Sequence, residues 1–253
     1  MKAMILAAGL GTRLRPLTND RPKALVEVAG RTLLEITIAR LRECGVGEVI
    51  VNVHHFARMV TEYLREKNNF GMRIEISEED RLLDTGGGLK QAAWFFREEG
   101  PETAPFILHN VDVISTIDLR RMLDFHTQNQ ALATLAVQQR QTSRYLLFDE
   151  QMRLCGRRLV KEQKTELVKP SPQLQEVAFS GIHVILPRLL RMMSEEGAFS
   201  IVQSYLRLAG EGQRIMGYRA DGDYWQDLGK PESIARAAED LKKQAMLRGG
   251  DTQ

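Results

Sequence analysis

Short apolar runs alternate along the chain with segments whose apolar residues recur at helical spacing. The runs typical of strands cover residues 3–7, 48–53, 72–76, 105–113 and 131–139. The segments with apolar residues three or four positions apart cover residues 32–44, 57–67, 88–100 and 119–128. Because strands that alternate with helices form βαβ units, this order predicts an α/β fold with a mostly parallel sheet and helices on both faces.

The pattern changes over residues of about 142–175, where short, polar-rich runs are separated by turns. We expect a small antiparallel insertion there. Core-strand character returns at residues 177–186 and 214–220, and Pro231 is typical of the first position of a long final helix. The sequence therefore predicts a single domain over residues 1–247 and a frayed tail over 248–253.

The composition narrows the classes of function. The chain has 253 residues, of which 43% are hydrophobic and 27% charged, and its net charge is only +2. Because acidic and basic residues are interspersed, we expect no broad basic surface for nucleic acid. No apolar run approaches the roughly 20 residues that span a bilayer, so no membrane association is expected. The sequence carries no indication of the oligomeric state.

The cysteines and the N-terminus bear on the compartment. Cys44 and Cys155 are the only cysteines and form no CxxC pair, which favours a reduced cytoplasm. The apolar start is followed directly by glycines and arginines, without the small-residue cleavage site of a signal peptide. We therefore expect a cytoplasmic protein.

A loop rich in glycine and cations follows the first predicted strand, in the stretch "LAAGLGTRLRPLTNDRPKALVEVAG". Gly9 and Gly11 let backbone N–H groups approach an oxyanion, and Arg13, Arg15 and Lys23 add positive charge. This combination predicts a phosphate-binding loop at the edge of a parallel sheet. A plain glycine turn with solvated arginines is the alternative that the loop alone leaves open.

Two better-known phosphate motifs do not fit this loop. The pattern GxxxxGK[ST] of P-loop proteins is absent. The glycines give only GxGxxL, which lacks the third glycine of the dinucleotide-binding fingerprint and argues against an NAD-dependent oxidoreductase.

Two aspartates stand at the ends of apolar elements, where phosphate chemistry could use them. Asp112 follows the strand-like run "PFILHNVD", and Asp227 lies in "YWQDLGKPE" just before the last helix. Mg²⁺ prefers one or two carboxylates together with phosphate oxygens, so this pair is a candidate metal site. Either residue could instead serve as a helix cap or turn residue.

Taken as a whole, Leu6 to Gly30 resembles the signature of the sugar-1-phosphate nucleotidyltransferases, approximately LAAGxGTRLxPLT followed by PKxLVPVAG. Glu27 stands where that family usually has proline. The strand-end motif (N/L)GD appears as "HNVD", with Val111 in place of glycine, and WxD(V/I)G appears as "WQDLG". The resemblance implies a Rossmann-like nucleotide-diphospho-sugar transferase fold and a reaction between an NTP and a sugar 1-phosphate.

The resemblance also implies the roles of individual residues. Catalytic roles fall to Arg13, Lys23, Asp112 and Asp227, and the two aspartates would bind Mg²⁺. The nucleotide would be contacted by Leu6, Ala8, Gly9, Gly11, Thr12, Arg13, Lys23, Gly86, Gly87 and Asn110. The sugar phosphate would be contacted by Lys169 in "LVKP" and by Gly181 in "FSGIHV". The "TGGG" segment would read the nucleobase through backbone groups, and a flexible turn at a helix start is the alternative.

Within the family, "TGGG" and the final "WQDLGKPE" are most similar to N-acetylmuramate-1-phosphate uridylyltransferases, which implies UTP and an amino-sugar phosphate. Mannose- or heptose-1-phosphate guanylyltransferases are the alternative, as is a catalytically silent protein that senses nucleotide or sugar. The retained aspartates argue against the silent protein. His54 and His55 are adjacent on a predicted strand and point to opposite faces, so we expect them to be structural.

Overall fold

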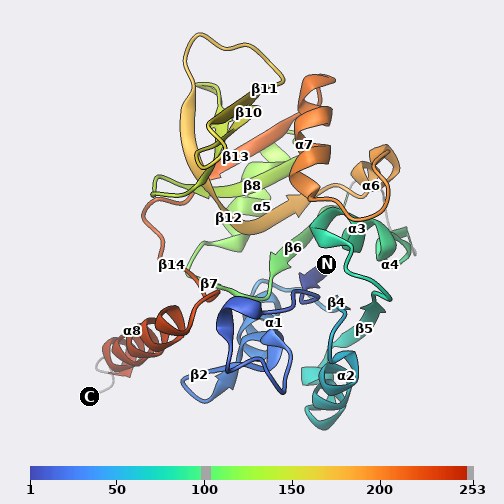
Figure 1. Cartoon of the computed structure of the whole chain (residues 1–253), viewed down its shortest axis with the longest axis vertical. Coiled ribbons are helices and arrows are strands. Elements are labelled where there is room, and N and C mark those ends of the chain that lie inside the picture. The colour runs from blue at the N-terminus through green and yellow to red at the C-terminus, as the bar shows by residue number, and fades with distance from the viewer. Residues whose placement is uncertain (98–103, 250–253) are drawn as a thin grey trace.

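The computed structural model describes residues 1–97 and 104–249, which form a central ten-stranded sheet with helices on its faces (Figure 1). Eight strands form its main path, in the order β11 (Lys164–Leu167), β10 (Leu154–Leu159), β9 (Arg144–Phe148), β12 (Gln175–Ile185), β6 (Phe106–Asn110), β1 (Lys2–Leu6), β4 (Glu48–Val53) and β5 (Arg73–Glu78). Strands β8 (Ala133–Gln138) and β13 (Ile215–Arg219) join this path through β12.

One half of the sheet is parallel. Strands β6, β1, β4 and β5 run in the same direction, and Ile5 on β1 lies between Val51 on β4 and His109 on β6. These strands are the apolar runs that the sequence predicts as buried strands. Because their carboxyl ends meet at one edge, the loops that follow them are brought together there.

The other half is antiparallel and centres on β12, which pairs antiparallel with β6, β8 and β9. Strands β9, β10 and β11 confirm the antiparallel character predicted for residues of about 142–175. They do not stand apart from the main sheet, because β12 pairs with β9 over residues 175–178 and with β6 over residues 182–185. The residues predicted as an insertion therefore extend the central sheet.

Helices cover both faces, as the sequence predicts. Ala3 and Ile5 of β1 belong to one buried apolar cluster and Met4, which points to the opposite face, belongs to another. The helices that contribute to the Ile5 cluster are α1 (Leu33–Glu43), α2 (Ala57–Glu66), α5 (Leu119–Gln128) and α8 (Pro231–Gly249). Those that contribute to the Met4 cluster are α3 (Asp84–Gln91), α4 (Ala93–Arg97), α6 (Arg188–Met192) and α7 (Ile201–Gly210).

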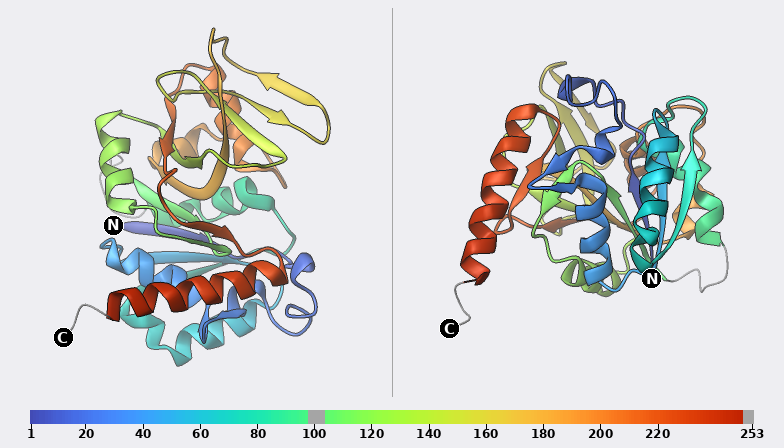
Figure 2. Two further views of the ribbon diagram at one scale, coloured as in Figure 1. Left: turned by 90° about the vertical axis from the view of Figure 1, so that its left-hand side faces the viewer. Right: turned by 90° about the horizontal axis from the view of Figure 1, so that it is seen from below.

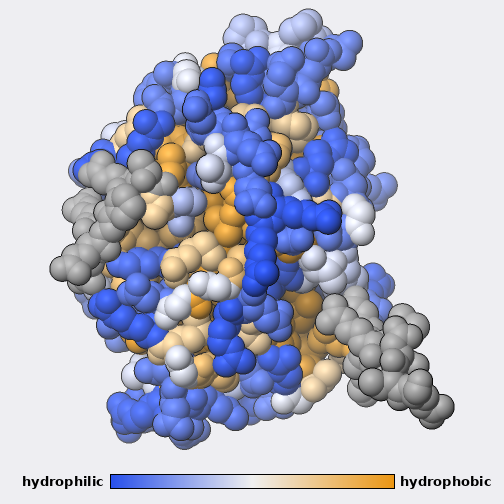
Figure 3. All heavy atoms as spheres, turned by 180° about the vertical axis from the view of Figure 1, so that it is seen from behind, coloured by the Kyte–Doolittle hydropathy of each residue, from blue (hydrophilic) through white to orange (hydrophobic). Residues whose placement is uncertain are grey.

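Smaller elements complete the edge where the parallel strands end. They are the 3₁₀ turns η1 (Thr12–Leu14) and η2 (Lys23–Leu25), the hairpin β2 (Glu27–Val28) and β3 (Arg31–Thr32), and the ladder β7 (Val113–Ser115) and β14 (Trp225–Asp227). The 3₁₀ turn η3 (Asn68–Gly71) lies at the other edge, directly before β5 begins. Figure 2 shows α8 running along the same side of the molecule as α1. Seen from behind the view of Figure 1, the surface has polar residues interspersed with apolar ones (Figure 3).

The structure corrects three predicted boundaries. The strand predicted over residues 105–113 breaks after Asn110, and β7 starts only at Val113. The helix predicted over residues 88–100 is divided into α3 and α4, and its end lies outside the described residues. Helix α8 starts at Pro231 as predicted and continues to Gly249, so the first two residues of the predicted tail are helical and residues 250–253 lie outside the described part. No described helix is both long enough and apolar enough to cross a membrane.

Candidate active site

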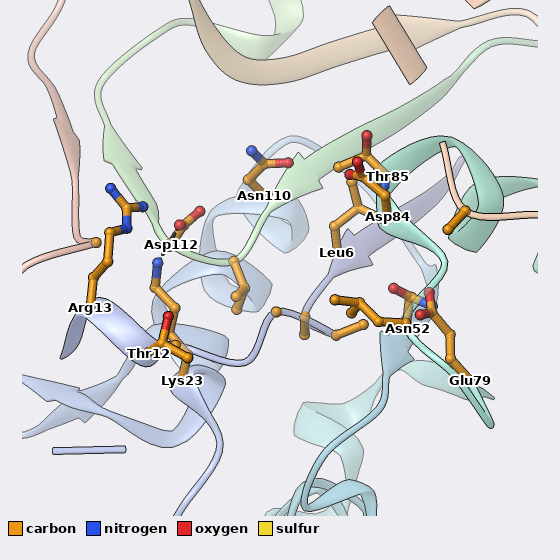
Figure 4. Close-up of a pocket in the computed structure, with 18 residues that line it drawn as sticks. Leu6, Thr12, Arg13, Lys23, Asn52, Glu79, Asp84, Thr85, Asn110 and Asp112 are labelled. Carbon is orange, nitrogen blue, oxygen red and sulfur yellow. Dashed lines mark hydrogen bonds and ion pairs between the residues drawn. The ribbon is translucent and has the colours of Figure 1, made fainter. Parts of the chain in front are cut away.

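A cavity of about 410 Å³ opens at the edge where β1, β4 and β6 end. Its lining residues are Leu6, Ala7, Ala8, Gly9, Gly11, Thr12, Arg13, Lys23, Asn52, Glu79, Leu82, Asp84, Thr85, Asn110, Val111, Asp112, Ala198 and Gly229. Figure 4 shows Arg13, Lys23 and Asp112 gathered at one end, and Asn52, Glu79, Asp84 and Thr85 at the other. The cavity therefore has a charged end suited to phosphates and a second end that bears amide, hydroxyl and carboxyl groups.

The loop after β1 forms one wall of the charged end. Gly11 has φ +63, and a Cβ there would come within 2.9 Å of Thr18 Cγ2. The Thr18 hydroxyl donates a hydrogen bond to the Gly11 carbonyl (2.8 Å), which fixes the turn into η1. At Gly9, a Cβ would meet nothing within 4 Å, so the backbone here borders open space. These properties fit a loop whose amides approach an anion closely.

Lys23 and Asp112 form an ion pair at this end of the cavity. The side chain of Lys23 is only 9% exposed, and that of Asp112 is 21% exposed. Lys23 is carried by η2, and Asp112 occupies the break between β6 and β7. The carboxylate of Asp112 thus faces the Lys23 ammonium in a sheltered part of the cavity.

Asp227 is brought next to Asp112 by the ladder of β7 and β14. Asp227 pairs with Val113, and the N–H of Leu228 donates to the Asp112 carbonyl (2.8 Å). A metal site made of these two acids, which are distant in the chain, requires the fold to bring them together, and the ladder places their backbones side by side. Asp227 itself does not line the cavity. Its Oδ1 accepts a hydrogen bond from the N–H of Gly229 (2.7 Å), and Gly229 does line the cavity.

Arg13 reaches the same place from the other side. A Cβ at Gly229 would lie 2.6 Å from Arg13 Nη2 and 2.6 Å from Asp227 Oδ1. A glycine at position 229 therefore leaves room beside the backbone for both this guanidinium and this carboxylate. Among the described residues there is no group of three or more His, Cys, Asp or Glu side chains that could hold a metal. The residues present fit a metal held by two carboxylates and completed by substrate oxygens.

Sequence reasoning missed the opposite end of the cavity. Glu79 is buried and accepts hydrogen bonds from Asn52 Nδ2 (2.8 Å) and from the N–H of Leu83 (2.8 Å). The bond to Leu83 holds the segment that carries Asp84 and Thr85 against the cavity (Figure 4). A signal for this group is present in the sequence, because Asn52 is a polar residue near the end of the apolar strand "EVIVNV".

Gly86 and Gly87 do not line the cavity and do not precede a helix, contrary to the expectation for the "TGGG" segment. They lie inside α3. A Cβ at Gly86 would come within 2.2 Å of the Phe199 ring, and one at Gly87 within 2.5 Å of the Gly197 carbonyl. The N–H of Gly86 donates to the Phe199 carbonyl (2.9 Å). The glycines therefore permit close packing, while Asp84 and Thr85 at the start of the helix face the cavity.

Asn110 and Val111 line the cavity at the end of β6. The side chain of Val111 is only 4% exposed, and its N–H donates to the Leu6 carbonyl (3.1 Å). The Oδ1 atom of Asn110 is buried without a hydrogen-bond partner. Gly181 has φ +75, and a Cβ there would lie 2.8 Å from Asn110 Nδ2. Gly181 thus lies directly behind Asn110 instead of lining the cavity.

Lys169 is not among the residues that line the cavity. It follows β11, and its N–H donates to the Cys155 carbonyl on β10 (3.2 Å). Its contact with the sugar phosphate stays a prediction.

His54 and His55 follow β4, which ends at Val53, so neither lies on the strand predicted for them. His54 Nδ1 lies 2.7 Å from the Glu79 carbonyl oxygen, and the ring of His55 packs on Phe56. Burial lowers the pKa of His109 to about 4 and that of His183 to about 3, so both rings are neutral at pH 7. His183 Nδ1 lies 2.8 Å from the Tyr205 hydroxyl in the core.

Known proteins resemble this chain over nearly its whole length. A family model described as nucleotidyl transferase matches residues 2–244. The N-acetylmuramate alpha-1-phosphate uridylyltransferase of Caulobacter vibrioides is 34% identical over 236 residues, which cover 91% of this chain and 93% of that protein. The mannose-1-phosphate guanylyltransferase of Mycobacterium tuberculosis is 30% identical over 244 residues, which cover 94% of this chain and 64% of that protein.

Solved structures show the same fold. A putative glucose-1-phosphate thymidylyltransferase from Bacillus anthracis superimposes with a TM-score of 0.78 at 18% identity, and the match covers 94% of each chain. At this identity the likeness concerns the fold alone. It confirms the nucleotidyltransferase-type α/β architecture that the resemblance implies.

Proposed function

The chain belongs to the nucleotidyl transferase family and is an enzyme of the sugar-1-phosphate nucleotidyltransferase class, and we propose that it uses UTP and an amino-sugar 1-phosphate. The products would be a UDP-amino sugar and pyrophosphate. The observation that supports this proposal is that Arg13, Lys23 and Asp112 lie at one end of the cavity, with Asp227 next to Asp112 on the ladder of β7 and β14.

The reaction that suits this cluster is an in-line displacement at phosphorus. An oxygen of the sugar 1-phosphate forms a bond to the α-phosphorus of the nucleotide. The bond from that phosphorus to the bridging oxygen of the β-phosphate breaks, and pyrophosphate leaves with the electron pair. Because the attacking oxygen is already deprotonated, the protein needs to supply no general base, and positioning and charge stabilisation carry the catalysis.

The residues of the charged end divide this work. The amides between Gly9 and Arg13, together with the Arg13 guanidinium, bind the β- and γ-phosphates that leave. Lys23 binds the α-phosphate, where negative charge accumulates in the transition state. Asp112 and Asp227 would hold Mg²⁺, which supplies further charge neutralisation at the phosphate oxygens.

The choice of nucleotide belongs to the opposite end of the cavity. Asp84, Thr85 and Asn110 offer hydrogen-bonding groups there, and Glu79 holds the segment in place. The proposal of UTP is supported by the 34% identity to a uridylyltransferase that this chain covers almost completely. A mannose-1-phosphate guanylyltransferase activity is the second candidate, supported by a relative at 30% identity.

We place this activity in the reduced cytoplasm. Cys44 and Cys155 are both free thiols in the structure, and burial raises the pKa of each. Small-molecule substrates, an NTP and a sugar 1-phosphate, are the partners that the cavity suits.

Pyrophosphate release tests the proposal directly. The protein is incubated with Mg²⁺ and each of four NTPs against a panel of sugar 1-phosphates that includes N-acetylmuramate, N-acetylglucosamine, mannose and heptose derivatives. We expect the fastest release with UTP and an amino-sugar phosphate. Preference for GTP with mannose 1-phosphate would favour the second candidate, and no release with any pair would favour a silent sensor of nucleotide or sugar.

A further inference from the structure

Arg140 lies in the connection between β8 and β9 and is held in an unusual environment. Its Cζ atom lies 3.6 Å from the centroid of the Trp225 ring. Its Nη2 donates a hydrogen bond to the Phe179 carbonyl (2.6 Å), and its Nε is buried without a partner. The guanidinium is therefore fixed by stacking and one hydrogen bond, while part of its hydrogen-bonding capacity is unused.

No carboxylate neutralises this cation. Within the described part of the chain, Arg140 has no Asp or Glu oxygen within 4.0 Å. Burial lowers its pKa, which Asp227 partly offsets from a greater distance. A partly buried guanidinium with an unsatisfied N–H and no ion-pair partner is unfavourable on its own, and an anionic ligand would relieve both deficits.

The position of Arg140 connects it to the candidate metal site. Trp225 and Asp227 are two residues apart on β14, so their side chains project from the same face of the strand. Arg140 covers Trp225, whereas Arg13 approaches Asp227 from the side of Gly229 and the cavity. Arg13 thus lies beside Asp227 on the cavity side, and Arg140 stacks on the ring of Trp225 two residues earlier on the same strand.

Strand β12 makes this arrangement rigid. Trp225 Nε1 donates to the Ser180 carbonyl (2.8 Å), and Arg140 donates to the preceding carbonyl, that of Phe179. Both carbonyls come directly before Gly181, where the register of β12 against β8 shifts. The irregularity therefore presents two successive carbonyls that orient the arginine and the ring on which it stacks.

We propose that Arg140, stacked on Trp225, binds the phosphate group of the incoming sugar 1-phosphate and presents it to the α-phosphorus beside Asp227. The inference rests on the proposed function and adds to it a second anion site, because Arg140 is not among the residues that line the cavity. A planar guanidinium can hold two phosphate oxygens and leave a third free for attack. Arg140 would thereby take the role that the resemblance gives to Lys169.

The test measures the KM of each substrate separately, in steady-state pyrophosphate release with the preferred substrate pair. Arg140→Gln keeps a donor for the Phe179 carbonyl but removes the charge, and Arg140→Lys keeps the charge without the planar fork. We expect Arg140→Gln to raise the KM for the sugar 1-phosphate about 10- to 100-fold, in line with the loss of one charge-assisted contact, and to leave the KM for the NTP within about twofold. Arg140→Lys should recover part of the loss.

Arg188→Gln is the matched control, because this arginine is exposed at the start of α6. Thermal unfolding of each variant reports on folding. Equal increases in both KM values, or a large fall in melting temperature with unchanged KM values, would show a structural role and overturn the inference. An unaltered KM in Arg140→Gln together with a raised KM in Lys169→Ala would return the role to Lys169.

The experiment distinguishes a failure of the role of Arg140 from a failure of the proposed function. A wild-type protein that releases pyrophosphate, with Arg140→Gln indistinguishable from it, rejects the role of Arg140 alone. A wild-type protein that releases no pyrophosphate with any substrate pair rejects the proposed function. In that case, titration calorimetry with the sugar 1-phosphates still measures whether Arg140→Gln abolishes binding, and wild-type binding that the substitution leaves intact would overturn the inference.

Discussion

Two cations, one in each half of the sheet, have different surroundings. In the parallel half, the ammonium of Lys23 is paired with Asp112 within the cavity. In the antiparallel half, other arginines pair with carboxylates, as Arg157 does with Glu166. Arg140 instead stacks on Trp225, and no carboxylate of the described residues lies within 4.0 Å of it. We therefore expect Lys23 to act beside an acid of the protein itself, and Arg140 to pair with an anion of the substrate.

The largest expected effect comes from the acid of the parallel half. Asp112→Asn should lower kcat about 10²- to 10³-fold, the effect typical of removing one charge-stabilising group from a transition state. The amide keeps the shape of the side chain, so we expect the fold to be retained. Single-turnover and steady-state pyrophosphate release measure the loss, and circular dichroism checks the fold.

Asp124→Asn is the control for this substitution, because Asp124 is an exposed residue on α5. It should leave kcat unchanged. Near-normal turnover in the Asp112 variant would show that the ion pair with Lys23 is structural and would remove the basis for a metal at this position.

A smaller effect is expected on the packing that joins α3 to Phe199. Gly86→Ala places a Cβ against the Phe199 ring and should reduce the free energy of unfolding by about 1–3 kcal/mol, as overpacking of a core typically does. Because this chain is large, each kcal/mol corresponds to a melting-temperature decrease of about 2–4 °C.

Gly47→Ala is the matched control, since a Cβ there would meet nothing within 4 Å. Calorimetry of both variants measures the difference. If Gly86→Ala instead raises the KM for the NTP with no loss of stability, the glycine contacts the nucleobase after all, as the resemblance implies.

The smallest expected effect concerns the boundary between the parallel and the antiparallel halves of the sheet, where β6 pairs with β12. His109 and His183 lie there, and burial lowers the pKa values to about 4 and about 3. The unfolded rings titrate near pH 6.5, so between that pH and the folded values the unfolded state binds more protons. The stabilisation is therefore present above pH 6.5 and is lost progressively as the pH falls.

Denaturant unfolding at pH 7.0 and pH 5.5 checks this expectation. Each of the two histidines should contribute a loss of roughly 1 kcal/mol over this interval. His183→Gln should reduce the difference in the free energy of unfolding between the two pH values by the contribution of one histidine, roughly 1 kcal/mol. A free energy of unfolding that is equal at both pH values would show that these rings do not stay neutral in the folded protein.

The two halves also differ in how much of their chemistry the sequence can reveal. Gly9, Gly11, Arg13 and Lys23 lie within one short stretch, so their spacing alone predicts a phosphate loop, and the structure places all four on one cavity. Asp112 and Asp227 also end apolar elements in a recognisable way. The sequence is sufficient to predict these residues because each group lies within one short loop or at the end of one strand.

The antiparallel half offers no such local signal. Arg140 meets Trp225 only because β8, β12 and β14 converge, and "QQRQTSRY" contains nothing that marks one arginine over another. The same limitation applies to Gly86, whose partner Phe199 is more than a hundred residues away. Contacts of this kind depend on tertiary packing, which periodicity and spacing do not encode.

The division of the site into a nucleotide half and a sugar-phosphate half can be tested most directly with two arginine variants and two substrates. KM values for the NTP and for the sugar 1-phosphate are measured for Arg13→Gln and Arg140→Gln under the same conditions. The division predicts opposite outcomes: Arg13→Gln raises mainly the KM for the NTP, and Arg140→Gln raises mainly the KM for the sugar 1-phosphate. Equal increases in both KM values for both variants would contradict it.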